Sequence, residues 1–200
     1  MFNQDLTNRL QRRFDLVFAC DQKRGIGKTN SIPWNLKAEI SHFRKLTSST
    51  AKSAPESESP SESESTWQNA VIMGRRTWES LPKKYRPLPN RINIVLTRNY
   101  DYQLPATVLR FSDLDQALAS LATAAVKRVF VIGGADVFKQ AMAHKSCGLL
   151  YLTEIMQTFD CDTFLPDFSG VFTLQESSEK QSENGVDYYY KVYRPKQETK

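Results

Sequence analysis

The nine residues from Ala70 to Trp78, AVIMGRRTW, run a short apolar strand directly into the start of a helix through Gly74. A short apolar run bounded by charged and turn-forming residues is typical of a buried strand. The same arrangement recurs at 128–138, RVFVIGGADVF, where the strand meets a pair of glycines. Two buried strands that each feed a helix predict an α/β protein with a parallel sheet.

Strands and helices alternate on both sides of these two segments. Further strands are predicted at 14–20, 91–97, 107–111 and 149–155, and helices at 36–46, 113–125 and from the paired glycines to about 143. Ser112, with Asp115 three residues later, is the expected N-cap of the helix that begins at 113. Glu183-Asn184-Gly185 supplies the turn of a hairpin between 171–180 and 186–193. This order predicts an α/β fold whose mostly parallel central sheet carries helices on both faces and ends in an antiparallel C-terminal hairpin.

A low-complexity segment interrupts this pattern at 48–66. It holds eight serines, four glutamates and two prolines but no large apolar residue, so it cannot bury enough surface to offset the entropy lost on ordering. We therefore expect a disordered surface loop inserted into a single domain at 14–195. Residues 1–13 are then an N-terminal extension, and residues 196–200 are a C-terminal tail.

The net charge is distributed unevenly along the chain. Four glutamates against Lys52 give the inserted segment a charge of −3, which leaves +8 for the rest of a chain whose total is +5. A basic folded body favours an anionic partner, which is nucleic acid, membrane lipid or a phosphorylated and carboxylated small molecule. No apolar run approaches the ~20 residues that a membrane-spanning helix needs, so no membrane span is expected.

The N-terminus and the cysteines narrow the class of protein further. The first thirteen residues contain three arginines but no apolar core, unlike a secretory signal. Asp5 and the shortness of the segment count against a mitochondrial presequence, so we expect a cytoplasmic protein. Cys20, Cys147 and Cys161 form no CxxC pair, and two of them lie in or beside apolar runs. They are expected to be reduced and structural, and no metal site is predicted.

A carboxylate stands on the apolar side of the first predicted helix. Leu36, Ile40, Phe43 and Thr47 project to one side at 100° per residue, and Glu39 falls within that stripe. One interpretation is a charged residue at the edge of an ordinary amphipathic helix. The other is a partly buried carboxyl whose pKa is raised by desolvation, or which pairs with a buried cationic ligand.

Two strand-to-helix junctions carry groups that bind phosphate. Paired glycines at 133–134 let the backbone approach a phosphate closely, although they also fit an ordinary tight turn. At 73–77 two arginines and a threonine join the start of a helix, and Arg98 follows the next strand. In an open α/β sheet, ligands bind beyond the carboxyl ends of the strands, where these groups would gather.

The glycines do not form a dinucleotide fingerprint. Gly25-Ile26-Gly27 lacks the third glycine of a GxGxxG motif. The residues alone therefore predict a basic α/β domain that binds a phosphate-bearing ligand and carries a candidate buried acid. They do not name the reaction.

A set of short motifs, taken in order, resembles the dihydrofolate reductase family. They extend from about Phe14 to Tyr193 at compatible spacings, and the inserted low-complexity segment has no counterpart in the core of that family. The motifs are VFA at 17–19, GIGK at 25–28, IPW at 32–34, VIMGRRTW at 71–78, RPL at 86–88, RINIVLTR at 91–98, VIGG at 131–134 and CDTFLP at 161–166.

The resemblance implies NADPH-dependent reduction of 7,8-dihydrofolate to 5,6,7,8-tetrahydrofolate, by hydride transfer to C6 and protonation of N5. Glu39 would accept hydrogen bonds from the 2-amino and N3 groups of the pterin and would govern proton delivery to N5. Trp34 would hold an ordered water, and Thr153 would brace the carboxylate. Arg91 would clamp the α-carboxylate of the substrate's glutamate. The remaining implied substrate contacts are Ile40, Phe43, Leu88 and Ile132.

The resemblance also assigns a cofactor site. Ala19, Ile26 and Ile132 would border the nicotinamide, while Thr77 and residues 133–137 would receive the pyrophosphate. Three arginines would surround the 2′-phosphate that separates NADPH from NADH. The full implied set is Ala19, Gly25, Ile26, Gly27, Lys28, Ser31, Arg75, Arg76, Thr77, Thr97, Arg98, Gly133, Gly134, Ala135, Asp136, Val137 and Phe138.

One residue departs from the family pattern. Phe138 stands where the family usually has a tyrosine near the nicotinamide, so a polar contact at the reacting centre is lost. This bears on the rate of hydride transfer and on cofactor orientation, not on gross activity. The loop at 21–31 is expected to close over the nicotinamide.

Two other classes of function remain open at this stage. A reductase of the same fold acting on a pyrimidine ribose phosphate would not need Glu39 in an apolar stripe. A non-catalytic basic domain could bind nucleic acid, but the arginines lie at strand ends and no aromatic stacking platform is evident. We expect a monomer that acts on a small molecule, with no nucleic-acid or membrane partner. Because the chain ends soon after the last predicted strand, no fused thymidylate-synthesising domain is expected.

Overall fold

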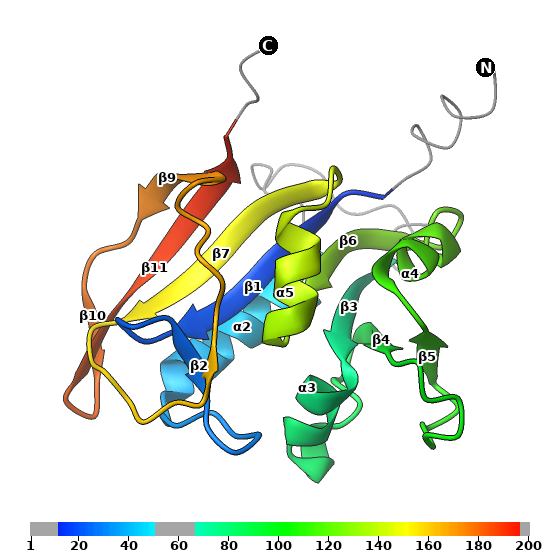
Figure 1. Ribbon diagram of the computed structural model, residues 1–200, viewed down its shortest axis with the longest axis horizontal. Helices are drawn as coiled ribbons and strands as arrows, with labels where there is room; N and C mark the ends of the chain where they lie inside the picture. Colours follow the sequence, from blue (N-terminus) through cyan, green and yellow to red (C-terminus); the bar gives the residue numbers. More distant parts are fainter. Residues whose placement is uncertain (1–11, 51–66, 197–200) are drawn as a thin grey trace, which may run out of the picture.

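The computed structural model describes residues 12–50 and 67–196 and contains a nine-stranded sheet (Figure 1). The strand order is β10-β11-β7-β1-β6-β3-β4-β5, and β9 pairs with β11. The parallel part comprises β1 (Phe14–Cys20), β3 (Gln68–Gly74), β4 (Arg91–Leu96), β5 (Val108–Phe111), β6 (Val126–Val131) and β7 (Cys147–Ile155). The antiparallel part comprises β9 (Phe172–Ser177), β10 (Gln181–Glu183) and β11 (Val186–Pro195). The predicted fold class is confirmed.

Strand β1 lies at the centre of the sheet, where the order of strands reverses. It pairs in parallel with β6 through Leu16 and Val131, and with β7 on its other side, from Phe14 to Cys20 (Figure 1). A reversal of strand order opens a crevice at the carboxyl ends of the strands, and this is where ligands bind in open α/β sheets. The site is therefore expected beside the ends of β1, β6 and β7.

Helices cover both faces of the sheet. On one face, α4 (Leu114–Ser120) and α5 (Ala135–Met142) contribute Leu118 and Phe138 to the largest hydrophobic cluster. On the other face, α2 (Lys37–Ser48) and α3 (Arg75–Ser80) lie against a second cluster built around Val71 and Phe130. Figure 1 shows α5 in front of the central strands and α2 behind them.

Several predicted boundaries are wrong in ways that have local causes. The N-cap of α4 is Asp113, not Ser112, because the Asp113 Oδ1 atom accepts a 2.9 Å hydrogen bond from the Gln116 N–H. The helix ends at Ser120 instead of 125, and β6 begins at Val126 instead of 128. The C-terminal hairpin is divided into three strands, because β9 and β10 pair with different parts of β11.

Three short elements were not predicted at all. β2 (Gly25–Gly27) pairs with β8 (Thr163–Phe164) in a separate two-stranded sheet, and a 3-10 turn covers Lys83–Tyr85. Strands of two or three residues have no measurable alternation of apolar residues, so their pairing is visible only in the folded chain. The segment at 21–31 is thus partly held in a strand pair.

The start of the inserted segment also differs from the prediction. Ser48 is the last residue of α2, and Ser49 and Thr50 continue the described chain. The rest of the predicted loop, 51–66, lies outside the described residues, as do 1–11 and 197–200. All three cysteines are free thiols. No helix within 12–50 and 67–196 is both long and apolar enough to cross a membrane.

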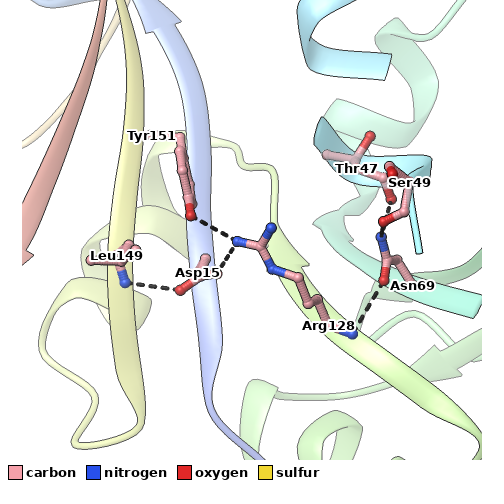
Figure 2. A network of polar contacts seen from close by, with 7 residues as sticks. All are labelled: Asp15, Thr47, Ser49, Asn69, Arg128, Leu149 and Tyr151. Carbon is pink, nitrogen blue, oxygen red and sulfur yellow. Dashed lines mark hydrogen bonds and ion pairs between the residues drawn. The ribbon is translucent and has the colours of Figure 1, made fainter. Parts of the chain in front are cut away.

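A polar network ties the end of α2 to the central strands (Figure 2). The buried Asn69 amide donates to the carbonyls of Thr47 (3.1 Å) and Ser49 (2.8 Å), and its oxygen accepts from the Arg128 N–H. The Arg128 guanidinium then donates to Asp15 (2.7 Å) and to the Tyr151 hydroxyl (2.8 Å). Asn69 therefore satisfies carbonyl groups at the end of α2 that have no partner within the helix.

We predict that Asn69→Ala lowers the free energy of unfolding by about 3 kcal/mol, because it leaves the carbonyls of Thr47 and Ser49 and the Arg128 amide without their partner. Urea unfolding measures the change. Gln68→Ala, at the exposed neighbouring position, is the control and should change the free energy by less than about 0.5 kcal/mol. Equal midpoints for the two variants would contradict the role of Asn69.

Candidate active site

Helix α2 places the Glu39 carboxyl at a partly open cavity of about 140 Å³. The Thr153 hydroxyl, on β7, donates to Glu39 Oε1 across 3.4 Å. Leu36, the residue before the helix, is buried in a cluster with Ile155 and Tyr188, and the first turn that follows it carries Glu39 to the cavity. The cavity is lined by Val17, Glu39, His42, Phe43, Leu46, Tyr151, Leu152, Thr153, Tyr190, Lys191 and Val192.

Burial raises the pKa of Glu39 from 4.5 to about 7, and the hydrogen bond from Thr153 opposes that rise. No Lys or Arg side chain lies within ion-pair distance of Glu39 in the described part of the chain. The carboxyl therefore exchanges its proton near neutral pH, which suits a general acid.

Trp34 places an unused hydrogen-bond donor in the same region. Its indole is 9% exposed and packs against Phe159, with ring centroids 5.4 Å apart. The Nε1–H is buried and has no partner among the described residues. A buried donor without a partner costs about 1–3 kcal/mol, so it points to an acceptor brought by a ligand or its solvent.

His42 lies one helical turn after Glu39 and was not predicted as a site residue. Its imidazole stacks on the Tyr190 ring, with centroids 3.9 Å apart and planes inclined by 21°. Burial, together with Lys45, lowers the pKa of His42. The ring is therefore neutral at neutral pH and acts as a wall of the cavity, not as a cation beside Glu39. Its spacing of three from Glu39 was the available signal in the sequence.

Arg91 is a buried cation at the start of β4. It is 7% exposed, donates to the Thr47 hydroxyl at 2.6 Å, and lies over the Phe43 ring at 5.9 Å. Burial, with Arg44 nearby, lowers the pKa of Arg91 to about 10. No described carboxylate forms an ion pair with it. A buried charge without a counter-ion is costly, so the guanidinium is suited to bind an anionic ligand. Leu88 and Phe43 belong to one apolar cluster beside it.

The two glycine junctions meet in space. The Gly74 N–H donates to the Gly133 carbonyl at 2.7 Å. A Cβ atom added at Gly134 would lie 3.2 Å from the Thr77 hydroxyl oxygen, and one at Gly133 would lie 2.9 Å from the Phe138 ring. Gly133 also has a φ of +111°, which disfavours side chains. These positions leave bare backbone beside a hydroxyl at the start of α5, a suitable surface for phosphate.

The predicted arginines differ in their availability. Arg75 forms an ion pair with Glu79 at 2.8 Å and lies over the Tyr102 ring at 5.6 Å. Arg76 and Arg98 are exposed and form no ion pair with a described residue. Those two are therefore free for a phosphate, whereas Arg75 is already engaged. Asp136 is exposed in the first turn of α5, where its backbone N–H, not its side chain, suits an anion.

The loop at 21–31 is fastened to the segment around Cys161. The buried Asp21 carboxylate accepts from the N–H groups of Gly25 (2.7 Å) and Phe159 (2.9 Å). Lys28 pairs with Asp160, and its backbone exchanges hydrogen bonds with Ser31. Ile26 is packed on the largest cluster. The predicted loop residues therefore lie together on one anchored segment.

The other predicted residues of the cofactor site lie on neighbouring strand ends. Ala19 packs with the cluster that contains Trp34, and Ile132 packs with the cluster around Val71. Thr97 is buried, and its hydroxyl accepts from the Asn99 N–H at 3.1 Å. Phe138 is 2% exposed, and its ring meets Phe18 edge-on with centroids 4.8 Å apart. The apolar ring that replaces the expected tyrosine is thus part of the core beneath the glycine turn.

The fold and these groups together are those of a small oxidoreductase. The family model described as dihydrofolate reductase matches residues 13–52 and 62–195. The chain belongs to the dihydrofolate reductase family. The break in the match falls within the inserted segment.

Named relatives agree with this assignment. The dihydrofolate reductase of Heliothis virescens is 41% identical over 193 residues, which cover 92% of this chain and 98% of that protein. The Drosophila melanogaster dihydrofolate reductase is 38% identical over 90% of this chain and 96% of that protein. Bifunctional dihydrofolate reductase-thymidylate synthase 1 of Arabidopsis thaliana is 38% identical over 94% of this chain, which spans 35% of that longer protein.

The buried carboxyl predicts a specific dependence of stability on pH. In the unfolded chain Glu39 ionises near its ordinary pKa of 4.5, and in the folded chain near 7. Between these values the unfolded state loses its proton first, so the folded state loses stability as the pH rises. Glu39→Gln removes this loss.

We expect the stability of Glu39→Gln relative to the unchanged chain to increase by about 2 kcal/mol between pH 4.5 and pH 8. This is less than the full linkage value because the residue is only half-buried. Urea unfolding at several pH values measures the difference. A difference that is the same at every pH would show that the carboxyl ionises normally.

Proposed function

We propose that this chain reduces 7,8-dihydrofolate to 5,6,7,8-tetrahydrofolate with NADPH. This proposal rests mainly on the environment of the Glu39 carboxyl. It is half-buried beside an apolar cavity, accepts a hydrogen bond from Thr153 and has no cationic partner among the described residues. Family membership supports the reaction, and the buried Arg91 supports a substrate with a carboxylate. A protein that keeps an acid and a cation desolvated in one region is prepared for a ligand that satisfies both.

Glu39 is proposed to bind the pterin ring. Its ionised carboxylate accepts two parallel hydrogen bonds from the 2-amino and N3 groups, a paired geometry that a carboxylate supplies well. This role explains why the acidic Glu39 lies within the apolar stripe of the helix, where Ile40 and Phe43 flank it. Ile40 is 54% exposed, so its side chain is accessible for contact with a bound ring.

Glu39 is also the proposed source of the proton that N5 of the substrate receives. With a pKa of about 7, a large fraction of the carboxyl holds a proton at neutral pH. The buried Trp34 N–H can hold a water that passes this proton to N5, while Thr153 fixes the carboxyl. Protonation of N5 makes C6 a better hydride acceptor, and general acid help of this kind contributes ~10²–10⁴ in rate.

Arg91 is proposed to bind the α-carboxylate of the substrate's glutamate. Thr47 holds one side of the guanidinium, and the Pro89 carbonyl accepts from its Nε at 3.0 Å. The orientation of the cation is therefore set before the substrate arrives. Leu88 and Phe43 pack against the aminobenzoyl ring in this proposal, and Ile132 borders the pterin.

The residues at the glycine junctions fit NADPH. The backbone of 133–137 and the Thr77 hydroxyl hold the pyrophosphate, while Arg76 and Arg98 bind the 2′-phosphate. When bound, NADPH supplies the hydride that reaches C6. Ala19, Ile26 and Ile132 would exclude water from the nicotinamide face. We also propose that the chain acts as a cytoplasmic monomer, without a nucleic-acid or membrane partner.

The direct test mixes the purified chain with NADPH and dihydrofolate and follows nicotinamide absorbance. Loss of absorbance that requires both compounds is expected. No loss would refute the proposed reaction, and loss with a pyrimidine ribose phosphate instead would favour the other reductase of this fold.

We predict that Glu39→Ala lowers turnover at pH 7 by at least ~10² because it removes both the pterin acceptor and the proton source. Lowering the pH, or supplying substrate that is already protonated at N5, should recover part of the loss. Steady-state rates across pH measure this. Unchanged turnover at pH 7 would refute the assignment of Glu39.

We predict that Arg76→Ala and Arg98→Ala each raise the KM for NADPH by about tenfold and leave the KM for NADH within about twofold, since a charge-assisted bond contributes about 1.5 kcal/mol. Arg194→Ala removes an exposed arginine from β11 and is the charge-matched control. Equal effects on the two cofactors would mean that the 2′-phosphate binds elsewhere.

A further inference from the structure

Helix α2 begins without a side-chain cap of its own. Its N-cap is Leu36, with extended backbone angles and no side chain able to accept a hydrogen bond. Leucine is among the poor N-cap residues, and the first amides of a helix have no partner within it. The first turn, which carries Glu39, therefore needs an acceptor from another part of the chain.

Glu183 supplies that acceptor from the end of β10. Its Oε1 accepts from the Lys37 N–H and its Oε2 from the Ala38 N–H, both at 2.8 Å, across 146 and 145 residues of sequence. The Asn184 side chain adds a 3.4 Å hydrogen bond to the Asn35 carbonyl. The tip of the β10–β11 hairpin is thus docked on the start of α2 by both oxygens of one carboxylate.

The cap acts on the residue immediately before Glu39. Glu39 is the third residue of α2, directly after the two residues whose amides Glu183 holds. These two hydrogen bonds fix the backbone of the first turn, from which the Glu39 carboxyl faces Thr153 and the cavity.

The charge of Glu183 acts in the same direction. The N-terminus of a helix stabilises an anion, which would favour the ionised form of Glu39. An ionised Glu183 on the same amides offsets this field and repels a second negative charge nearby. The other titratable groups that face the cavity with Glu39 are His42, Tyr151, Tyr190 and Lys191, and all remain when Glu183 is changed.

We propose that Glu183 is a positioning residue of the active site. Its two-oxygen cap fixes the first turn of α2 so that Glu39 faces the cavity, and its negative charge helps keep the Glu39 proton in place near neutral pH. This inference rests on the proposed role of Glu39 as the proton source. No step of the reaction requires Glu183 to touch the substrate.

The experiment compares Glu183→Gln, Glu183→Ala and the control Glu179→Gln. The Glu183→Gln variant keeps one acceptor oxygen but loses the charge, whereas Glu179 is an exposed acid whose carboxylate makes no described hydrogen bond. The first readout is the carboxyl ¹³C titration of Glu39 in the protein without ligands. The second is the pH profile of turnover with NADPH and dihydrofolate.

In Glu183→Gln we expect the Glu39 midpoint to fall by about half a pH unit, because the negative charge that opposes ionisation of Glu39 is removed from the helix N-terminus. Turnover at pH 8 should fall about threefold and turnover at pH 6 should stay nearly unchanged. Glu183→Ala should add a loss at every pH, because the first turn is then uncapped. Glu179→Gln should leave both readouts where they were.

An unmoved Glu39 midpoint in Glu183→Gln would overturn the proposal, as would an equal shift in Glu179→Gln. If Glu183→Ala fails to fold, Glu183→Gln still decides, since it retains an acceptor. Failure of the proposed function is distinguishable, because the titration needs neither cofactor nor substrate. A shifted midpoint in a chain that does not reduce dihydrofolate would support the cap and refute the reaction.

Discussion

The site depends on two ionisable groups that folding withdraws from water without pairing them. Burial raises the pKa of Glu39 to about 7 and lowers that of Arg91 to about 10, and neither forms an ion pair with a described residue. Each group costs stability in the free protein. The proposed substrate offers paired donors at one end and a carboxylate at the other, so its binding would compensate both costs.

Helix α2 links these two groups mechanically. Glu39 lies in its first turn and Thr47 in its last, where the Thr47 hydroxyl holds the Arg91 guanidinium of β4. Asn69 holds the C-terminal end of the same helix, and Glu183 holds its beginning. The spacing between acid and cation is therefore set by one helix fastened at both ends. A rigid element between two binding groups is how an enzyme fixes the geometry of a bound substrate.

Much of this arrangement follows from the sequence, and the failures at the candidate site have a common cause. The apolar run of β1 predicts Phe14–Cys20 correctly, and the stripe containing Glu39 predicts a carboxyl that faces the sheet. The stacking of His42 on Tyr190 and the cap from Glu183 were not predicted. Each joins residues from opposite ends of the chain, and no local pattern records such a contact. The prediction of Ser112 as the N-cap of α4 failed for a different reason. Ser112 and Asp113 are adjacent, and both have side chains that are able to cap a helix.

Local rules are broken together at the start of α2, and this argues for function there more strongly than any single feature. Leu36 is a poor N-cap, Glu39 lies among apolar residues, and the Trp34 indole N–H is buried without a described partner. Natural sequences tolerate such conflicts mainly at sites that serve function and compensate for them elsewhere. Glu183 compensates the first conflict and Thr153 part of the second. The third has no compensation within the described chain, so the donor that remains is the one a bound ligand or its solvent must satisfy.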